Sequence, residues 1–207
     1  MSSVKAQQAA RTRQRVLLAA AEVFDEVGYE QASVTRIVER AGLTLGALYF
    51  HFGSKQGLAE ALMNAQPTTI EPHLESTGLQ RMVDITLVWA DRMERDPILR
   101  AGVRLAVEQG SHGMNDATSF EEWRELMRGH LDVARRAGEL REGTCPDRLA
   151  RFLVGACTGL QIYSNLAAGR ADLMERVCDM WDLLLPSVAS EAVARGVRVD
   201  PVRVSSR

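Results

Sequence analysis

The first 66 residues of this chain are divided into short helical segments by glycines and by residues that cap helices. Apolar residues recur at helical spacing between Gly28, Gly42 and Gly53, and glycine readily ends a helix because it tolerates a positive φ. The pattern predicts four helices joined by tight turns, the first ending at Gly28 and the fourth reaching about Gln66. The last three helices are each preceded by a residue that can cap the helix N-terminus: Ser33, Thr44 and Ser54.

The second and third of these helices are joined by Ala41-Gly42-Leu43, which is the pattern of a helix-turn-helix. In such a motif the second helix presents small or polar residues to a groove of DNA, although a helical hairpin with a central glycine is also common as core structure. The residues expected to hold the helices together are Val34, Ile37, Val38, Leu43 and Leu48, and the expected outer face is Thr44, Leu45, Gly46, Tyr49 and His51.

The rest of the chain shows longer helical periods and no convincing alternation typical of strands, so the whole chain is predicted to be all-α. Pro67 and Pro72 indicate the end of the N-terminal unit. Residues 111–119 are rich in glycine, asparagine and serine and are expected to form a loop, and residues 196–207 are expected to be disordered. The helices predicted beyond the prolines cover residues 78–96, 97–110, 120–137, 146–168 and 171–194.

The composition is that of a folded protein, with 46% hydrophobic and 25% charged residues. No apolar run approaches the ~20 residues of a membrane span, and residues 1–15 lack the apolar centre of a secretory signal, so a cytoplasmic protein without a membrane partner is expected. The net charge of −2 does not indicate nucleic-acid binding. However, the first fifteen residues contain no acid and four basic side chains that suit phosphate contacts: Lys5, Arg11, Arg13 and Arg15.

Catalysis and metal binding are not expected from this sequence. An enzyme needs a nucleophile with a base, a metal cluster or a phosphate-binding loop. The four histidines have no ligand spacing, no glycine-rich phosphate loop occurs, and the three cysteines form no C-x-x-C pair. We therefore expect no enzyme activity, catalytic residue, metal ligand or cofactor. A purely structural scaffold would leave the short, capped N-terminal helices unexplained.

The segment at residues 41–55, AGLTLGALYFHFGSK, resembles the DNA-binding signature of the TetR family of bacterial repressors. Residues 24–30 and 33–35 are similar to the family's first-helix end and second-helix start. The resemblance implies a homodimer with a variable, ligand-sensing C-terminal domain. It also implies that Gly46 lets the helix approach the bases, and that phosphate or groove-wall contacts come from Thr35, Thr44, Tyr49, His51 and Lys55.

Some of these side chains have a structural alternative. The rings of Tyr49 and His51 can equally pack inside the small domain, and Phe24, Leu48 and Phe52 are expected in its core. With the resemblance, residues 1–54 are assigned to the helix-turn-helix domain. Residues 55–195 are assigned to a larger helical domain for ligand binding and dimerisation, and residues 196–207 to a tail.

The C-terminal half resembles the γ-butyrolactone receptors of actinobacteria through residues 96–106 and 120–124. These receptors repress antibiotic or differentiation genes until a diffusible lactone or furan binds. The resemblance places Trp123 in the ligand cavity, where a flat ring suits a small, largely apolar molecule. Polar contacts are expected from Gln66, Thr158 and Gln161 and apolar walls from Val88 and Trp89, whereas the apolar residues around Trp181 suggest a dimer seam.

One residue departs from the lactone receptors. Between Thr44 and Gly46 they often carry a lysine that can reach guanine edges, whereas this chain has Leu45, which can make only apolar contacts such as with a thymine methyl. The alternative prediction is a TetR-type repressor or pseudo-receptor that answers an antibiotic or drug and controls efflux or resistance. In either case the expected partners are operator DNA, a small-molecule inducer and a second copy, at the nucleoid in the cytoplasm.

Overall fold

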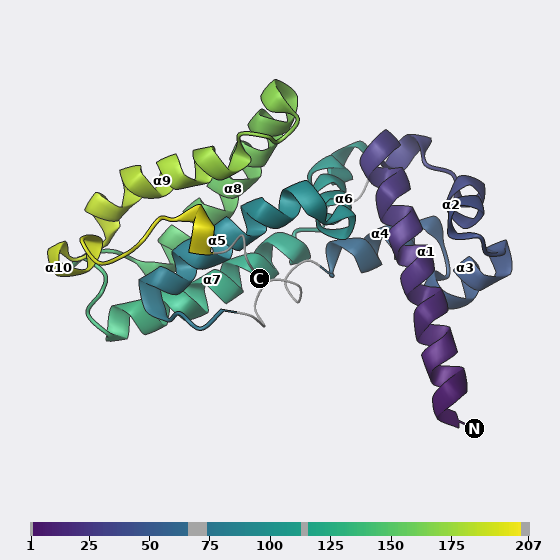
Figure 1. Ribbon diagram of the computed structural model, residues 1–207, viewed down its shortest axis with the longest axis horizontal. Helices are drawn as coiled ribbons and strands as arrows, with labels where there is room; N and C mark the ends of the chain where they lie inside the picture. Colours follow the sequence, from purple (N-terminus) through teal and green to yellow (C-terminus); the bar gives the residue numbers. More distant parts are fainter. Residues whose placement is uncertain (1, 66–73, 113–115, 204–207) are drawn as a thin grey trace. The chain divides into compact units, whose positions relative to one another are not determined.

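The computed structural model describes residues 2–65, 74–112 and 116–203 and consists of helices (Figure 1). Within these ranges no strand is formed beyond an isolated bridge between Leu140 and Ala189, which confirms the all-α prediction. None of the helices within these residues is long and apolar enough to cross a membrane. The contacts divide the chain into two compact units, residues 1–66 with 96–119 and residues 67–95 with 120–207.

The first unit contains the predicted short helices, and each predicted cap is made. The side-chain oxygens of Ser33, Thr44 and Ser54 accept hydrogen bonds from backbone N–H groups three residues further on, at 3.1, 3.3 and 2.9 Å. Gly42 ends its helix with φ 61°, as the tight turn requires. The elements of this unit are α1 (Ser2–Gln31), α2 (Val34–Ala41), α3 (Leu45–Phe52), α4 (Lys55–Met63), α6 (Pro97–Glu108) and the 3₁₀ helix η3 (Gln109–His112).

Gly28 interrupts α1 at the point where the sequence predicts its end. Its φ of 74° and ψ of 176° are not helical, and the chain resumes for only one short turn to Gln31. A Cβ atom at this position would lie 2.9 Å from Nη2 of Arg104 and 3.0 Å from Oε2 of Glu108. Glycine is therefore required by the backbone conformation, whereas these two neighbouring atoms are the ends of flexible side chains that can shift.

The helix α6 packs against α1 and α4, so a segment from the middle of the sequence completes the N-terminal unit. Nε of Arg100 lies 2.7 Å from the Asp25 carboxylate, and Nη1 of Arg104 donates to the Asp25 carbonyl at 2.5 Å. The predicted domain limit at residue 54 separates these segments, whereas the contacts group residues 55–66 and 96–119 with the N-terminal helices. The reason is that α4 and α6 bury their apolar faces against α1.

The second unit is built from longer helices around a core that contains Trp181. This side chain is completely buried within one copy of the chain, and its indole Nε1 donates to Oγ1 of Thr86 at 2.7 Å. Trp181 itself is therefore a core residue, and a dimer seam formed by the apolar residues around it stays a prediction. The elements are α5 (Gly78–Arg95), α7 (Thr118–Arg136, grouped here from Phe120), α8 (Pro146–Ala168), α9 (Leu173–Val188), α10 (Glu191–Ala194) and the 3₁₀ helix η4 (Pro201–Arg203).

The C-terminal segment differs from its prediction in two places. The helix expected over residues 171–194 is split at Ala189, where the chain becomes extended because the Ser190 N–H donates to the Glu139 carbonyl at 2.8 Å. Residues 196–203, expected to be disordered, are held against α5, because the Arg198 N–H donates to Oε1 of Gln80 at 2.8 Å. The last four residues, 204–207, lie outside the described residues.

The environment of Gly28 yields a stability prediction. We expect Gly28→Ala to lower the free energy of unfolding by about 1–3 kcal/mol, because an L residue is strained at this φ and ψ. Gly129→Ala is the control: it lies exposed within α7 with no atom near the added Cβ, and should leave stability unchanged or raise it by up to about 1 kcal/mol. Urea unfolding of both variants measures the difference, and equal stabilities would contradict the assignment.

Candidate nucleic-acid interface

The helix α3 has one buried side and one open side. Leu48 is completely buried, together with Ile37 and Val38 of α2, which confirms the predicted contact between the two helices. On the opposite side Leu45 is 42% exposed and Tyr49 48% exposed. Because only one side of α3 packs against the rest of the unit, its other side faces solvent and can serve as an interaction surface.

The turn before α3 is fixed by a residue of α1 that the sequence analysis did not assign to the motif. Nη2 of Arg15 donates to the Ala41 carbonyl at 2.6 Å and to the Gly42 carbonyl at 3.5 Å. These carbonyls lie at the C-terminal end of α2, where a cation is favoured by the helix dipole. The signal in the sequence is weak, because Arg15 lies 26 residues from Ala41 and nothing local indicates the pairing.

The two arginines of α2 form ion pairs with a carboxylate of α1. Arg36 and Arg40 form ion pairs with Glu26 at 2.6 and 2.5 Å. The hydrogen bond from Arg40 lowers the pKa of the Glu26 carboxyl, so the pair stays charged near neutral pH. Thr35, predicted to contact DNA, is exposed on the first turn of α2, and its side chain is therefore accessible to a ligand.

Lys55 and His51, predicted to contact phosphate or the groove wall, are both half-buried. Nζ of Lys55 lies 4.3 Å from the Tyr29 ring centroid and donates to the Glu30 carbonyl at 3.4 Å, and burial lowers its pKa. Lys55 thus ties the start of α4 to the end of α1. The ring of His51 stands edge-on to the rings of Phe50 and Phe52, at centroid distances of 5.0 and 6.3 Å.

The expected core aromatics divide into two kinds. Phe24 is completely buried and stacks on Tyr29 at a centroid distance of 5.9 Å, and Leu48 is also completely buried, as predicted. Phe52 is only half-buried, and the Arg13 guanidinium covers its ring at 4.9 Å from the centroid. The short helix α3 leaves too little of this unit beyond Phe52 to enclose it.

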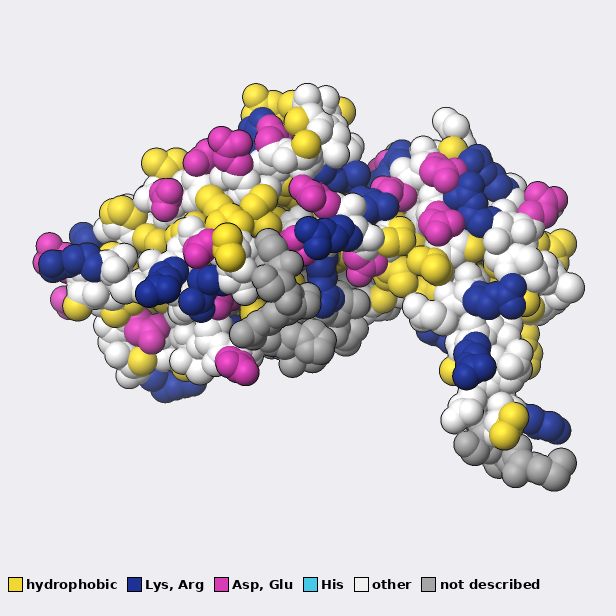
Figure 2. All heavy atoms as spheres, viewed as in Figure 1, with side chains coloured by type: hydrophobic (Ala, Val, Ile, Leu, Met, Phe, Trp, Pro, Cys, Tyr) yellow, Lys and Arg dark blue, Asp and Glu magenta, His cyan; other side chains and the backbone are white. Residues whose placement is uncertain are grey.

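The N-terminal part of α1 carries positive charge. Lysine and arginine side chains lie along this stretch in the view of Figure 2, and α1 extends past α2 and α3 in Figure 1. The described side chains from Val4 to Arg11 are exposed, and the sequence has no acid before Glu22. A basic helix with no neighbouring acid suits contact with the phosphates of nucleic acid.

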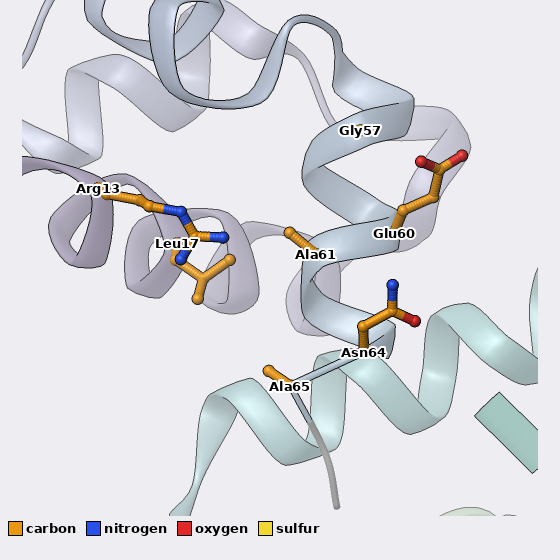
Figure 3. Close-up of a pocket in the computed structure, with 7 residues that line it drawn as sticks. All are labelled: Arg13, Leu17, Gly57, Glu60, Ala61, Asn64 and Ala65. Atoms are coloured by element: carbon orange, nitrogen blue, oxygen red, sulfur yellow. The ribbon is translucent and has the colours of Figure 1, made fainter. Parts of the chain in front are cut away.

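A surface depression of about 490 Å³ lies between α1 and α4 in the same unit (Figure 3). It is open to solvent and carries opposite charges, from Arg13 on one side and Glu60 on the other. Among the described residues, none of those predicted to bind ligand lines it, so it does not match the predicted inducer cavity. The residues lining it are Arg13, Leu17, Gly57, Glu60, Ala61, Asn64 and Ala65.

The residues predicted to bind ligand lie on three helices of the second unit. Trp89 on α5, Trp123 on α7 and Gln161 on α8 are all buried, with 7%, 9% and 5% of their surface exposed. Thr158 is half-buried, and its hydroxyl donates to the Val154 carbonyl at 2.8 Å. Val88 is half-buried on α5, and Gln66 lies outside the described residues.

Comparison with known proteins covers nearly the whole chain. Residues 16–62 match the family described as bacterial regulatory proteins, tetR family, and residues 76–189 match the tetracyclin repressor-like C-terminal domain. The A-factor receptor protein of Streptomyces griseus is 36% identical over 198 residues, which are 94% of this chain and 70% of the relative. A TetR regulator of Streptomyces fradiae, TylP, superimposes with a TM-score of 0.88 at 42% identity, covering 95% of each chain. A γ-butyrolactone receptor described as ArpA-like superimposes with a TM-score of 0.73 at 28% identity, covering 95% of this chain and 98% of the other.

Gly46 tests whether the open side of α3 approaches DNA closely. An added Cβ would meet only Oγ1 of Thr44, at 3.8 Å, so Gly46→Ala should fold as the parent does and be at least as stable, because alanine favours helix. We expect operator affinity nevertheless to fall by roughly ten-fold, or about 1.4 kcal/mol, because the methyl group occupies space needed by the bases. A binding titration on specific DNA measures this, and an unchanged affinity would contradict close approach at Gly46.

Proposed function

The chain belongs to the TetR family of bacterial regulators, and from this we propose that it is a transcriptional repressor released from operator DNA by a small γ-butyrolactone- or furan-type autoregulator. The observation that carries the proposal is that α3, the second helix of a helix-turn-helix, is packed on one side through Leu48 and exposed to solvent on the other. The A-factor receptor protein matches nearly the whole chain and not the DNA-binding part alone. This match supports the proposal that the chain binds a small-molecule ligand. The genes controlled are those of antibiotic or other secondary-metabolite production, and the protein acts on the nucleoid in the cytoplasm.

On DNA, α3 enters the major groove and the basic start of α1 contacts phosphates. Thr35, Thr44 and Tyr49 are exposed and supply hydrogen-bonding groups at the rim of α3. Lys55 and His51 contribute from the edge of the surface, where their half-buried side chains keep α4 and α3 in place. Their contact with phosphate is part of the proposal.

The inducer binds in the second unit beside Trp123. A buried tryptophan with Val88 and Trp89 offers an apolar lining, and the buried amide of Gln161 offers a polar contact for a lactone carbonyl or hydroxyl. The inducer releases DNA only if it binds the released conformation more tightly than the DNA-bound one. Gln66 and Thr158 remain candidates for further polar contacts.

Two copies pair through an apolar face formed by α8 and α9. Leu166 of α8 is 80% exposed and Leu183 of α9 is 79% exposed, and Phe152 and Ile162 are further exposed apolar residues of α8. Gly155 and Gly159 lie on the exposed side of α8 with open space around them, which allows a second helix to approach closely. Pairing places two copies of α3 on successive faces of the major groove, about one helical turn of DNA apart or a multiple of it.

The repressor function is tested by a gel shift with the purified protein on DNA upstream of its own gene. We expect a specific complex that is dissolved by an organic extract of the native culture and by synthetic γ-butyrolactones. Trp123→Phe and Gln161→Leu should bind the same DNA unchanged but require roughly thirty-fold more inducer, because each removes a buried contact worth about 2 kcal/mol.

Circular dichroism should establish that both variants are folded. A complex that only antibiotics dissolve would favour the drug-responsive alternative, and a search of the whole genome for bound sites follows if the upstream DNA is not bound. Loss of DNA binding by the folded Gln161→Leu variant would contradict the assignment of this residue to the inducer.

The dimer face makes a separate prediction. Leu166→Glu should weaken self-association by a hundred-fold or more, since an unpaired charge in an interface costs roughly 3–5 kcal/mol. Val202→Glu is the control, because Val202 is similarly exposed but lies in η4. Sedimentation equilibrium measures both variants, and a Leu166→Glu protein that remains fully dimeric would exclude this face.

A further inference from the structure

The open side of α3 carries two exposed apolar side chains beside the hydroxyl of Tyr49. The helix reads LGALYFHF and contains no arginine, lysine, asparagine, glutamine or acidic residue. Phe50 is 82% exposed, beside the exposed Leu45 and Tyr49. Residues 45 and 49 lie along one line of the helix and residues 46 and 50 along a neighbouring line, because the members of each pair are four apart.

The exposure of Phe50 is not explained by the packing of this unit. The buried side of α3 is already formed by Leu48, and the ring of Phe50 meets the His51 ring edge-on at a centroid distance of 5.0 Å. A large side chain left in water on a helix that has a buried side available indicates a surface for another molecule. Leu45 and Phe50 lie five residues apart, about 140° around the helix, on either side of Tyr49 and Gly46. We call these two exposed side chains the apolar strip of α3.

Arginine and lysine, the side chains that usually contact guanine, are absent from α3. The cations of the neighbouring helices contact other groups of the protein. Arg36 and Arg40 are bound to Glu26, and Lys55 is held by the Glu30 carbonyl and the Tyr29 ring. The basic start of α1 supplies attraction to phosphates, which carries no sequence information. Beside the hydroxyl groups of Thr44 and Tyr49, the side chains that α3 presents to the bases are those of the apolar strip.

The one apolar feature of base edges in the major groove is the C5-methyl group of thymine. We propose that Leu45 and Phe50 select operator half-sites by contact with thymine methyl groups, in place of hydrogen bonds to guanine. The inference rests on the proposed repressor function and adds to it the chemical feature of the DNA that is recognised. Gly46, between the two residues, lets the helix backbone come close enough for both side chains to reach methyl groups.

The test replaces thymine by deoxyuridine, which removes the methyl group and leaves the hydrogen-bonding edge intact. The operator is first selected from random duplexes with the purified full-length protein, and each thymine of one half-site is then replaced singly. At two or more positions we expect affinity to fall roughly three- to five-fold, the value of one buried methyl group. Replacing such a thymine by cytosine should weaken binding more, and 5-methylcytosine should recover part of the loss.

Variants assign the effect to the two residues. Leu45→Ala and Phe50→Ala should fold normally because both side chains are exposed, bind the thymine operator more weakly, and no longer distinguish it from the uracil operator at one position each. Val107→Ala, which trims an exposed residue of α6, is the control and should keep full discrimination.

The outcomes separate this inference from the function on which it rests. Specific binding that no uracil substitution weakens would overturn thymine-methyl recognition and leave the repressor function standing. Discrimination that persists in both Leu45→Ala and Phe50→Ala would overturn the assignment to these residues. Failure to select any DNA sequence would overturn the repressor function itself, and the inference with it.

Discussion

The burial of Leu48 is the contact on which the rest of the DNA-binding unit depends. A helix of eight residues is too short to be stable in water by itself, so α3 exists because its buried side packs against α1 and α2. The same contact decides what the open side can do. The packing of Leu48 with Ile37 and Val38 fixes the rotation of α3 about its own axis. The residues on the opposite side of the helix therefore face solvent.

The helix α6 belongs to the first unit although it lies far from the N-terminal helices in the sequence. It lies within the residues that match the C-terminal family description, yet it packs against α1 and α4 and holds Asp25 through Arg100 and Arg104. It follows α5 after the single residue Asp96, which is extended because Pro97 disfavours helix in the residue before it.

Charge and apolar surface have separate roles in the proposed interface. Arg36 and Arg40 of α2 pair with Glu26, and Lys55 at the start of α4 contacts the end of α1, so these cations help to position the helices. In the proposed interface the cations at the start of α1 contact phosphates, and the side chains of Leu45 and Phe50 contact the bases. This division explains how a chain with a net charge of −2 can carry a DNA-binding surface, because the charge that matters is local.

The sequence by itself determined the features that are set by neighbouring residues. The three caps, the breaks at Gly28 and Gly42 and the all-α class were all predictable, because helix ends are made by groups within a few residues of each other. Only the tertiary structure decided the features that join distant segments. These are the packing of α6 with α1, the burial of Trp181, the capture of Lys55 by Glu30, the hydrogen bond from Arg198 to Gln80 and the exposure of Phe50. Their physical reason is common: burial and ion pairing depend on which surfaces meet after folding, and no local pattern records that.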